Sequence, residues 1–364
     1  MALFVVRIPL PGLLATFPLG DLAAVLLVVI ALLRPTKESR PIPAWYVVFF
    51  ALLMLFLIMS STANEVDWAK RCIKIVTLAA LAALIASGRV DLISGLRGLS
   101  LALLINIPLF FLGLTPDFYG GALTGYIGDK NIAGFYYTVV PILLLAFTDR
   151  AWQRWAIISL SFGAVTLTGS RSSIAAYGFA LLWLLFSRRL NTLGKIVLGA
   201  ILFFVYQFIN DNFAQIGEFT SRVGSDLLRL RIDEASQAKV DMAPWYGLGL
   251  GQSQVQLQGS TWFFHNSYLA LIVEGGLVVA IAIVGLYAVV GLQLFQPKIQ
   301  SFHARVIEAA TVAVFLCALR LGEVFFTLPG FLVIGMGLLL MAERNAMSKG
   351  PGELLTGKAF SKTL

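Results

Sequence analysis

The residues of this chain that could take part in chemistry gather in one polar interval, residues 229–276, within an otherwise apolar sequence. It begins with Arg229 and Arg231 and holds His265 near its end. Between positions 210 and 265 there are four basic and six acidic residues, so the arginines are individual features and not parts of a basic tail. Guanidinium groups bind phosphate oxygens through paired hydrogen bonds, and an imidazole takes a proton from a hydroxyl near neutral pH. The pattern favours a site that binds a phosphate and activates a hydroxyl.

Two further arginines lie at the ends of apolar segments, where an arginine is costly unless it is paired or faces water. Arg171 comes directly before Ser172 and Ser173, and the backbone N–H groups of a helix that begins there would suit an anion. Arg320 stands near Glu323 at the end of a later segment. The alternative for Arg171 is a side chain that only extends to the membrane surface.

The interval from Leu227 to Val240 predicts an amphipathic helix that carries both of its arginines. Arg229 stands four residues before Asp233 and Arg231 three residues before Glu234, so surface ion pairs are an equally good explanation for each arginine alone. The interpretation as phosphate ligands is favoured because a histidine and a glycine-rich turn follow in the same interval.

His265, with Asn266 after it, lies where the polar interval returns to an apolar segment. That position suits a general base, although the His-Asn-Ser stretch could instead only cap the following helix. Glu274 lies inside the apolar segment, and a buried carboxylate there needs a cationic partner, for which an arginine from another element is the natural choice. Gly249 is the middle glycine of a tight turn whose backbone we expect to be exposed.

The elements that hold these residues are membrane helices. With 59% hydrophobic and 13% charged residues, the chain departs far from the roughly 25% charged residues of soluble proteins. Apolar runs recur along its length, which predicts an all-α polytopic membrane protein and not a barrel. Eleven spans are expected, or twelve if an apolar lead-in at 4–17 also crosses, and they lie at about 18–33, 44–60, 69–87, 99–114, 131–148, 156–168, 172–187, 195–209, 266–290, 306–319 and 328–342.

The basic residues orient the chain, because positively charged loops stay in the cytoplasm. Alternate loops and the tail hold 16 of the 27 lysines and arginines, whereas the opposite short loops at 61–68, 115–130 and 169–173 hold only Lys130 and Arg171. The loop at 210–265 then lies outside the cytoplasmic membrane. Nucleotide-sugars are absent there, so the substrate must be activated beforehand and carried across on a lipid. We expect four regions, namely membrane helices at 1–209, an external catalytic loop at 210–265, further membrane helices at 266–342 and a cytoplasmic tail at 343–364.

Several metal and nucleotide motifs are missing from the sequence. There is no Asp-x-Asp pair, Walker lysine motif or His-Glu-x-x-His site, so we expect no metal, no other cofactor and no nucleic-acid partner. Cys72 and Cys317 fall within expected spans without metal-ligand spacing, which is typical of small buried hydrophobic residues.

The motifs of the polar interval resemble those of the bacterial O-antigen ligases and the related O-antigen polymerases. That family carries Arg-Leu at the start of an external helix, then Pro-x-x-Gly-x-Gly, then His-Asn-x-Tyr-Leu followed by Glu-x-Gly. The likeness covers about residues 120–290, although Asp233 replaces the aromatic residue of the first motif. The matching positions are Arg229-Leu230, Pro244 to Gly249, His265 to Leu269, Glu274 to Gly276, Ser170-Arg171 and Asp129-Lys130-Asn131.

The resemblance implies an all-helical transferase of lipid-linked sugars in the bacterial cytoplasmic (inner) membrane, surrounded by membrane lipids. It would move a glycan from an undecaprenyl-diphosphate carrier to a hydroxyl of a glycan or lipid A–core acceptor, with inversion and without a metal. Arg171 and Arg229 would bind the diphosphate with help from Arg231 or Arg320, and His265 would accept the proton. Asn266, Tyr268, Glu274 and Gly249 would support the site, and Glu65 and Asp67 are alternative bases.

Other functions remain open at this point. A ligase and a repeat-unit polymerase share these motifs and differ only in the acceptor. A transporter or flippase whose arginines bind an anionic head group would show ionisable residues in several mid-spans and a pair of broken helices, neither of which is evident. A structural scaffold would not require arginines, a histidine and a glycine turn in one loop.

Overall fold

The structure is a computed structural model that describes residues 1, 3, 6, 18–34, 40–212, 223–294 and 301–348. Eleven helices in this part of the chain follow the eleven expected spans one by one. They are α1 (Leu19–Leu33), α2 (Ala44–Ala63), α3 (Ala69–Ala86), α4 (Leu92–Phe111), α5 (Lys130–Leu144), α6 (Ala151–Leu167), α7 (Arg171–Phe186), α8 (Thr192–Asn212), α10 (Ser267–Leu286), α11 (Phe302–Ala318) and α12 (Leu328–Ser348).

The predicted all-α polytopic membrane fold is confirmed. Five helical segments are long and apolar enough to cross a membrane by length and composition, and three shorter helices are also apolar. The five are Ala44–Ala63, Leu92–Phe111, Lys130–Phe147, Ser267–Gly291 and Leu328–Asn345. The lead-in at 4–17, apart from residue 6, and the tail beyond 348 lie outside the described residues.

The largest differences from the expected helix boundaries are at the start of α4 and the end of α12. The helix α4 begins at Leu92 instead of near 99, because the Asp91 side chain accepts hydrogen bonds from the backbone N–H groups of Ile93 and Ser94 and so caps an earlier start. The helix α12 continues to Ser348, beyond the end of the apolar span expected at about 342. Polar residues beyond an apolar run can prolong its helix, and hydropathy alone does not mark that end.

The centre of the bundle is formed by helices with small residues on their contact faces. Most of α11 is buried, including five alanines, and α11 packs against α7. Gly335 of α12 faces Ala82 of α3, where an added side chain would come within 3.2 Å of the alanine Cα. Small residues let membrane helices approach closely, since lipid supplies no hydrophobic force between them. This packing fixes the helix ends that carry the polar residues.

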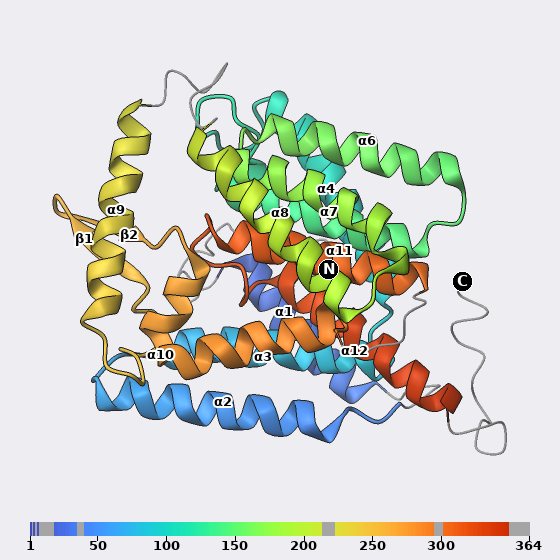
Figure 1. Cartoon of the computed structure of the whole chain (residues 1–364), viewed down its shortest axis with the longest axis horizontal. Helices are drawn as coiled ribbons and strands as arrows, with labels where there is room; N and C mark the ends of the chain where they lie inside the picture. Colours follow the sequence, from blue (N-terminus) through green and yellow to red (C-terminus); the bar gives the residue numbers. More distant parts are fainter. Residues whose placement is uncertain are drawn as a thin grey trace.

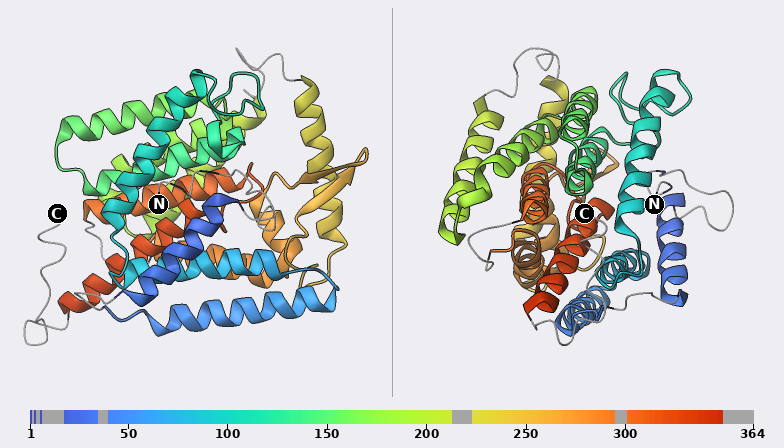
Figure 2. Two further views of the ribbon diagram at one scale, coloured as in Figure 1. Left: turned by 180° about the vertical axis from the view of Figure 1, so that it is seen from behind. Right: turned by 90° about the vertical axis from the view of Figure 1, so that its right-hand side faces the viewer.

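The polar interval forms a cap across one end of the bundle. Its helix α9 (Val223–Asp241) runs across the direction of α2 and α3, and a hairpin of β1 (Gln254–Leu257) and β2 (Ser260–Phe263) lies beside it (Figures 1 and 2). A small core that includes Ile232, Val255, Phe264 and Val273 joins this cap to α10. The cap therefore holds α9 over the start of α10.

The external loop contains a helix, as expected, and also a hairpin that the sequence analysis did not predict. Its strands pair in antiparallel register, with Leu257 opposite Ser260, and the intervening Gln258 and Gly259 both have positive φ angles of 54° and 76°. Two such residues form the turn type that matches the twist of a two-stranded ribbon. The glycine at the second turn position was the sequence signal for this hairpin.

Candidate functional site

The side chains of His265, Asp233 and Arg320 meet at the start of α10. Asp233 Oδ1 lies 3.7 Å from His265 Nδ1, and Asp233 Oδ2 lies 3.9 Å from Arg320 Nη1. The three side chains are 26%, 33% and 31% exposed, so the cluster is sheltered but open to a substrate. At 3.7 Å the carboxylate faces Nδ1 without a hydrogen bond, which leaves the other nitrogen, Nε2, for an incoming group.

The helix α9 places Asp233 on this cluster because its inner face is fixed by Ile232 and Ser236, which are both buried. Arg229 lies one turn before Asp233 and is half-buried, whereas Arg231 is exposed. Asp233 faces His265 and Arg320. The two arginines of this helix have different surroundings.

The start of α10 holds His265 in place. Asn266 caps this helix by accepting hydrogen bonds from the backbone N–H groups of Tyr268, at 2.9 Å, and Leu269, at 3.2 Å. The hydroxyl of Ser267 donates to the Leu321 carbonyl, so the segment after α11 is tied to the same place. The capping alternative is thus realised by Asn266, and it fixes the backbone beside His265.

Gly322 brings the segment that carries Arg320 against the backbone beside His265. An added Cβ at this glycine would lie 1.8 Å from the Phe264 carbonyl oxygen, so only a glycine permits this close approach. Tyr268 adds a second tie, since its hydroxyl donates to the Phe315 carbonyl in α11 at 3.0 Å. Its supporting role is therefore to join α10 to α11.

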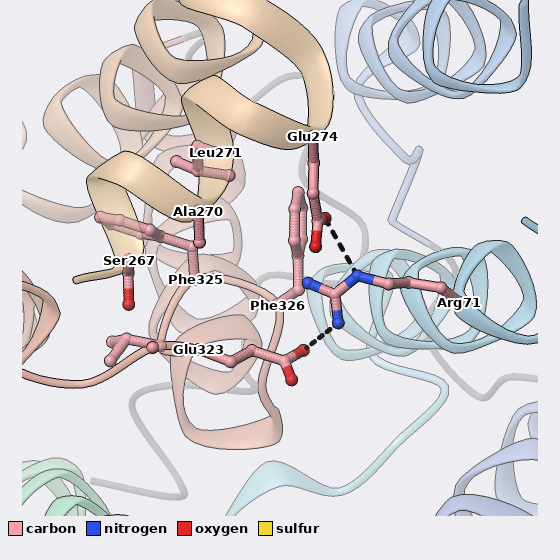
Figure 3. A pocket seen from close by; sticks show the side chains of 10 residues that line it. Arg71, Ser267, Ala270, Leu271, Glu274, Glu323, Phe325 and Phe326 are labelled. Carbon is pink, nitrogen blue, oxygen red and sulfur yellow. Dashed lines mark hydrogen bonds and ion pairs between the residues drawn. The ribbon is translucent and has the colours of Figure 1, made fainter. Parts of the chain in front are cut away.

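Glu274 is the buried centre of a charged network below this cluster. It is 2% exposed and accepts hydrogen bonds from Arg71 Nε, at 3.0 Å, and from the Ser253 hydroxyl, at 2.7 Å. The other side of the Arg71 guanidinium binds Glu323 at 3.1 Å, as Figure 3 shows, and Lys74 also binds Glu323 at 3.0 Å. A small pocket lined by Phe325 and Phe326 lies beside this network.

The sequence indicated that Glu274 needs an arginine but did not identify Arg71. Glu323, which the sequence associated with Arg320, also binds Arg71 and Lys74, and Arg320 faces Asp233. The missed signal was the group Lys70, Arg71 and Lys74, three cations at the end of a span that the charge rule places outside the cytoplasm. Cations at that end are exceptional and indicate buried acidic partners.

A break in α10 lies directly after Glu274. Gly275 and Gly276 have non-helical backbone angles, and Gly276 has a φ of 70°. Their departure from the helix frees carbonyl groups, which accept hydrogen bonds from the glycine-rich turn: Leu248 N–H donates to the Val273 carbonyl at 2.7 Å and Gly249 N–H to the Glu274 carbonyl at 3.1 Å. The turn that we expected to be exposed is therefore occupied by α10, and Gly249 supports the site by positioning it.

The end of α2 holds the other side of this turn. Ser60 donates to the Tyr246 carbonyl at 2.8 Å, and the Leu250 N–H donates to the Ser61 hydroxyl at 2.9 Å. An added Cβ at Gly249 would lie 2.7 Å from the Ser61 Cα. Glu65 and Asp67, the alternative bases, follow α2 and are both exposed. The α2 end thus supports the turn, while those carboxylates face outward.

Arg171 is the first residue of α7 at the same end of the bundle. The hydroxyls of Ser170 and Ser173 lie 2.9 Å apart beside it. The Ser173 side chain also forms a hydrogen bond with Cys317, which lies one turn before Arg320 in the chain. Helix α5 approaches closely here, since an added Cβ at Gly134 would lie 2.6 Å from the Ser173 hydroxyl. These contacts bring the start of α7 and the end of α11 together, so Arg171 and Arg320 stand on neighbouring helix ends.

A metal site is not evident in the part of the chain that is described. No group of three or more His, Cys, Asp and Glu side chains there is arranged to hold a metal ion. Arg171, Arg229 and Arg320 come to this end of the bundle from α7, α9 and the segment after α11. Guanidinium groups in that setting suit a doubly charged ligand such as a diphosphate.

Comparison with known proteins gives one family match. Residues 156–284 match the family model described as O-antigen ligase. The matched segment runs from α6 into α10 and includes Arg171, Arg229, Asp233, His265 and Glu274, while Arg71 and Arg320 lie outside it. No curated protein matches the chain. Together with the helical membrane fold, this match, which covers about a third of the chain, confirms the resemblance to that family seen in the sequence.

Proposed function

We propose that the chain transfers a glycan from an undecaprenyl-diphosphate carrier to an acceptor hydroxyl at the outer face of the bacterial cytoplasmic membrane. The observation that carries this proposal is the position of Asp233 between His265 and Arg320. It combines an oriented imidazole, which can act as a base, with a guanidinium group, which can bind phosphate.

In the proposed reaction His265 Nε2 accepts the proton of the acceptor hydroxyl as its oxygen bonds to the anomeric carbon. The bond from that carbon to the diphosphate oxygen breaks, and its electron pair leaves with undecaprenyl diphosphate. Attack opposite the leaving group inverts the anomeric configuration. Asp233 stabilises the imidazolium that forms, since it faces the other ring nitrogen. The proposal requires no metal, because arginines offset the charge of the leaving diphosphate.

Arg171, Arg229 and Arg320 are the proposed diphosphate ligands. Arg171 begins α7, and Arg229 is the half-buried arginine of α9. Arg320 faces the Asp233 carboxylate, and we propose that a diphosphate oxygen binds the same guanidinium group. Arg231 has the weaker case, since it is exposed. Each preorganised donor aimed at developing charge contributes roughly 100- to 1,000-fold to a rate.

The ligase and polymerase forms of this function share their donor chemistry and differ in the acceptor. A transfer assay with the reconstituted protein separates them: an undecaprenyl-diphosphate oligosaccharide is offered either lipid A–core or a second lipid-linked unit. Transfer to the first identifies a ligase, and transfer to the second a polymerase. A folded protein that transfers to neither would refute the enzymatic proposal.

The role of His265 is tested in the same assay. His265→Ala should lower turnover by roughly 100- to 10,000-fold, the range of general base catalysis, while the donor still binds. Full activity of this variant would show that His265 is not the general base. Inhibition of the wild-type protein by a chelator would contradict the metal-independent reaction.

A further inference from the structure

A second pocket lies at the opposite end of the bundle from His265, between α1 and α4. It contains about 620 Å³ of space, part of it open to the surroundings. It is lined by Met1, the last two turns of α1, the turn from α3 to α4 and the first turn of α4. Figure 2 shows α1 and α4 next to each other at this side of the bundle. Its walls are apolar, and its polar rim includes Arg34, Arg89 and Asp91.

The rim carries a net positive charge, since its two arginines outnumber its one carboxylate. Asp91 is occupied as the cap of α4, where it accepts hydrogen bonds from the N–H groups of Ile93 and Ser94 and from the Ser94 hydroxyl. Arg89 Nη1 donates to the Leu32 carbonyl at 2.8 Å. A guanidinium has five N–H donors on three nitrogens, so this anchors Arg89 and leaves donors on its other nitrogens.

The walls of the pocket continue into apolar surface on both flanking helices. Leu26 and Ile30 of α1 are 59% and 52% exposed, and Leu101 and Leu104 of α4 are 57% and 45% exposed. Such faces are expected to lie in the hydrocarbon of the membrane. The arginines are at the helix ends that the charge rule places in the cytoplasm. The pocket thus combines a cationic rim at the level of lipid head groups with apolar walls at the level of acyl chains.

We propose that this pocket binds one anionic phospholipid of the cytoplasmic leaflet. Arg34 and Arg89 bind the head-group phosphate, and an acyl chain lies along the apolar surfaces of α1 and α4. Basic pockets at this level between membrane helices suit anionic head groups. Free phosphate would satisfy the arginines alone, but it would not use the apolar walls. This site is separate from the transfer site, so it holds whether the chain is a ligase or a polymerase.

The test is native mass spectrometry of the delipidated full-length protein, titrated with phosphatidylglycerol, phosphatidylethanolamine or inorganic phosphate. We expect one phosphatidylglycerol molecule to be retained with clear preference over phosphatidylethanolamine. The double variant Arg34→Gln/Arg89→Gln should bind it about 30-fold more weakly, which corresponds to about 1 kcal/mol for each arginine. The matched control is Arg97→Gln, an exposed arginine of α4 that does not line the pocket, and it should leave binding unchanged.

Three outcomes would overturn the proposal. They are equal retention of the two lipids by the wild-type protein, equal loss of binding in the Arg97→Gln control, and displacement of the lipid by inorganic phosphate at similar concentration. Because Arg89 also binds α1, its loss could disturb folding. Arg34→Gln alone, with an unchanged melting temperature, should therefore still weaken phosphatidylglycerol binding by about 5-fold, and unchanged binding in that variant would equally contradict the proposal.

Discussion

The Asp233 carboxylate lies 3.7 Å from Nδ1 of His265, although the two residues stand on different elements of the cap. We predict that Asp233→Asn lowers turnover by about 10- to 100-fold, as is usual when a group that orients an essential imidazole is lost. Donor binding should change much less, since the arginines remain. Turnover and the donor KM, measured in the transfer assay, check this split.

The control for this change is the neighbouring residue. Glu234→Gln removes an exposed carboxylate from the same turn of α9 and should leave turnover within about 2-fold, because exposed charges contribute little. Equal losses of turnover in both variants would mean that any lost negative charge on α9 has this effect. That result would contradict a specific role of Asp233 beside His265.

The two arginines of α9 should differ in their importance. Arg229 is half-buried and Arg231 is exposed. Arg229→Ala is expected to lower the transfer rate by roughly 100- to 1,000-fold, by analogy with the loss of one preorganised donor, whereas Arg231→Ala should change it only a few-fold. Arg229→Lys should restore little, because an ammonium lacks the paired donors of a guanidinium. A larger effect at Arg231 than at Arg229 would reverse the proposed assignment.

The network around Glu274 should dominate the stability of the cap. Arg71→Met leaves Glu274, which is 2% exposed, without its arginine, and loss of one partner of a buried pair costs about 3–5 kcal/mol. Lys74→Met should cost less than about 1 kcal/mol, because Lys74 and Glu323 are 26% and 30% exposed. Denaturant unfolding in detergent compares the two. The double variant Arg71→Met/Glu274→Gln should lose less than the sum of its single changes, and additive losses would argue against a coupled pair.

The membrane helices were predictable from the sequence because their apolar runs are local, and so was the start of α10, where Asn266 supplies the cap. The partners in the site depend on tertiary packing. Arg71 meets Glu274 only once α3 has packed beside α10, and Asp233 faces His265 only because Ile232 and Val273 share one small core. The departure from the family pattern at Asp233 was visible, but its partners were not.

The break in α10 gives a prediction with opposite signs for two glycines of one helix. Gly276 has a φ of 70°, and an added Cβ would lie 1.8 Å from the Trp245 carbonyl oxygen, so Gly276→Ala forces either strain or a shift of the glycine-rich turn. We expect a loss of at least about 2 kcal/mol together with reduced transfer, since the turn and Glu274 move with it. Gly285 has open space around the same position, so Gly285→Ala should leave stability unchanged or raise it by up to about 1 kcal/mol. Melting temperatures in detergent report both effects, and a stable, active Gly276→Ala variant would show that the break in α10 is not required to hold the site.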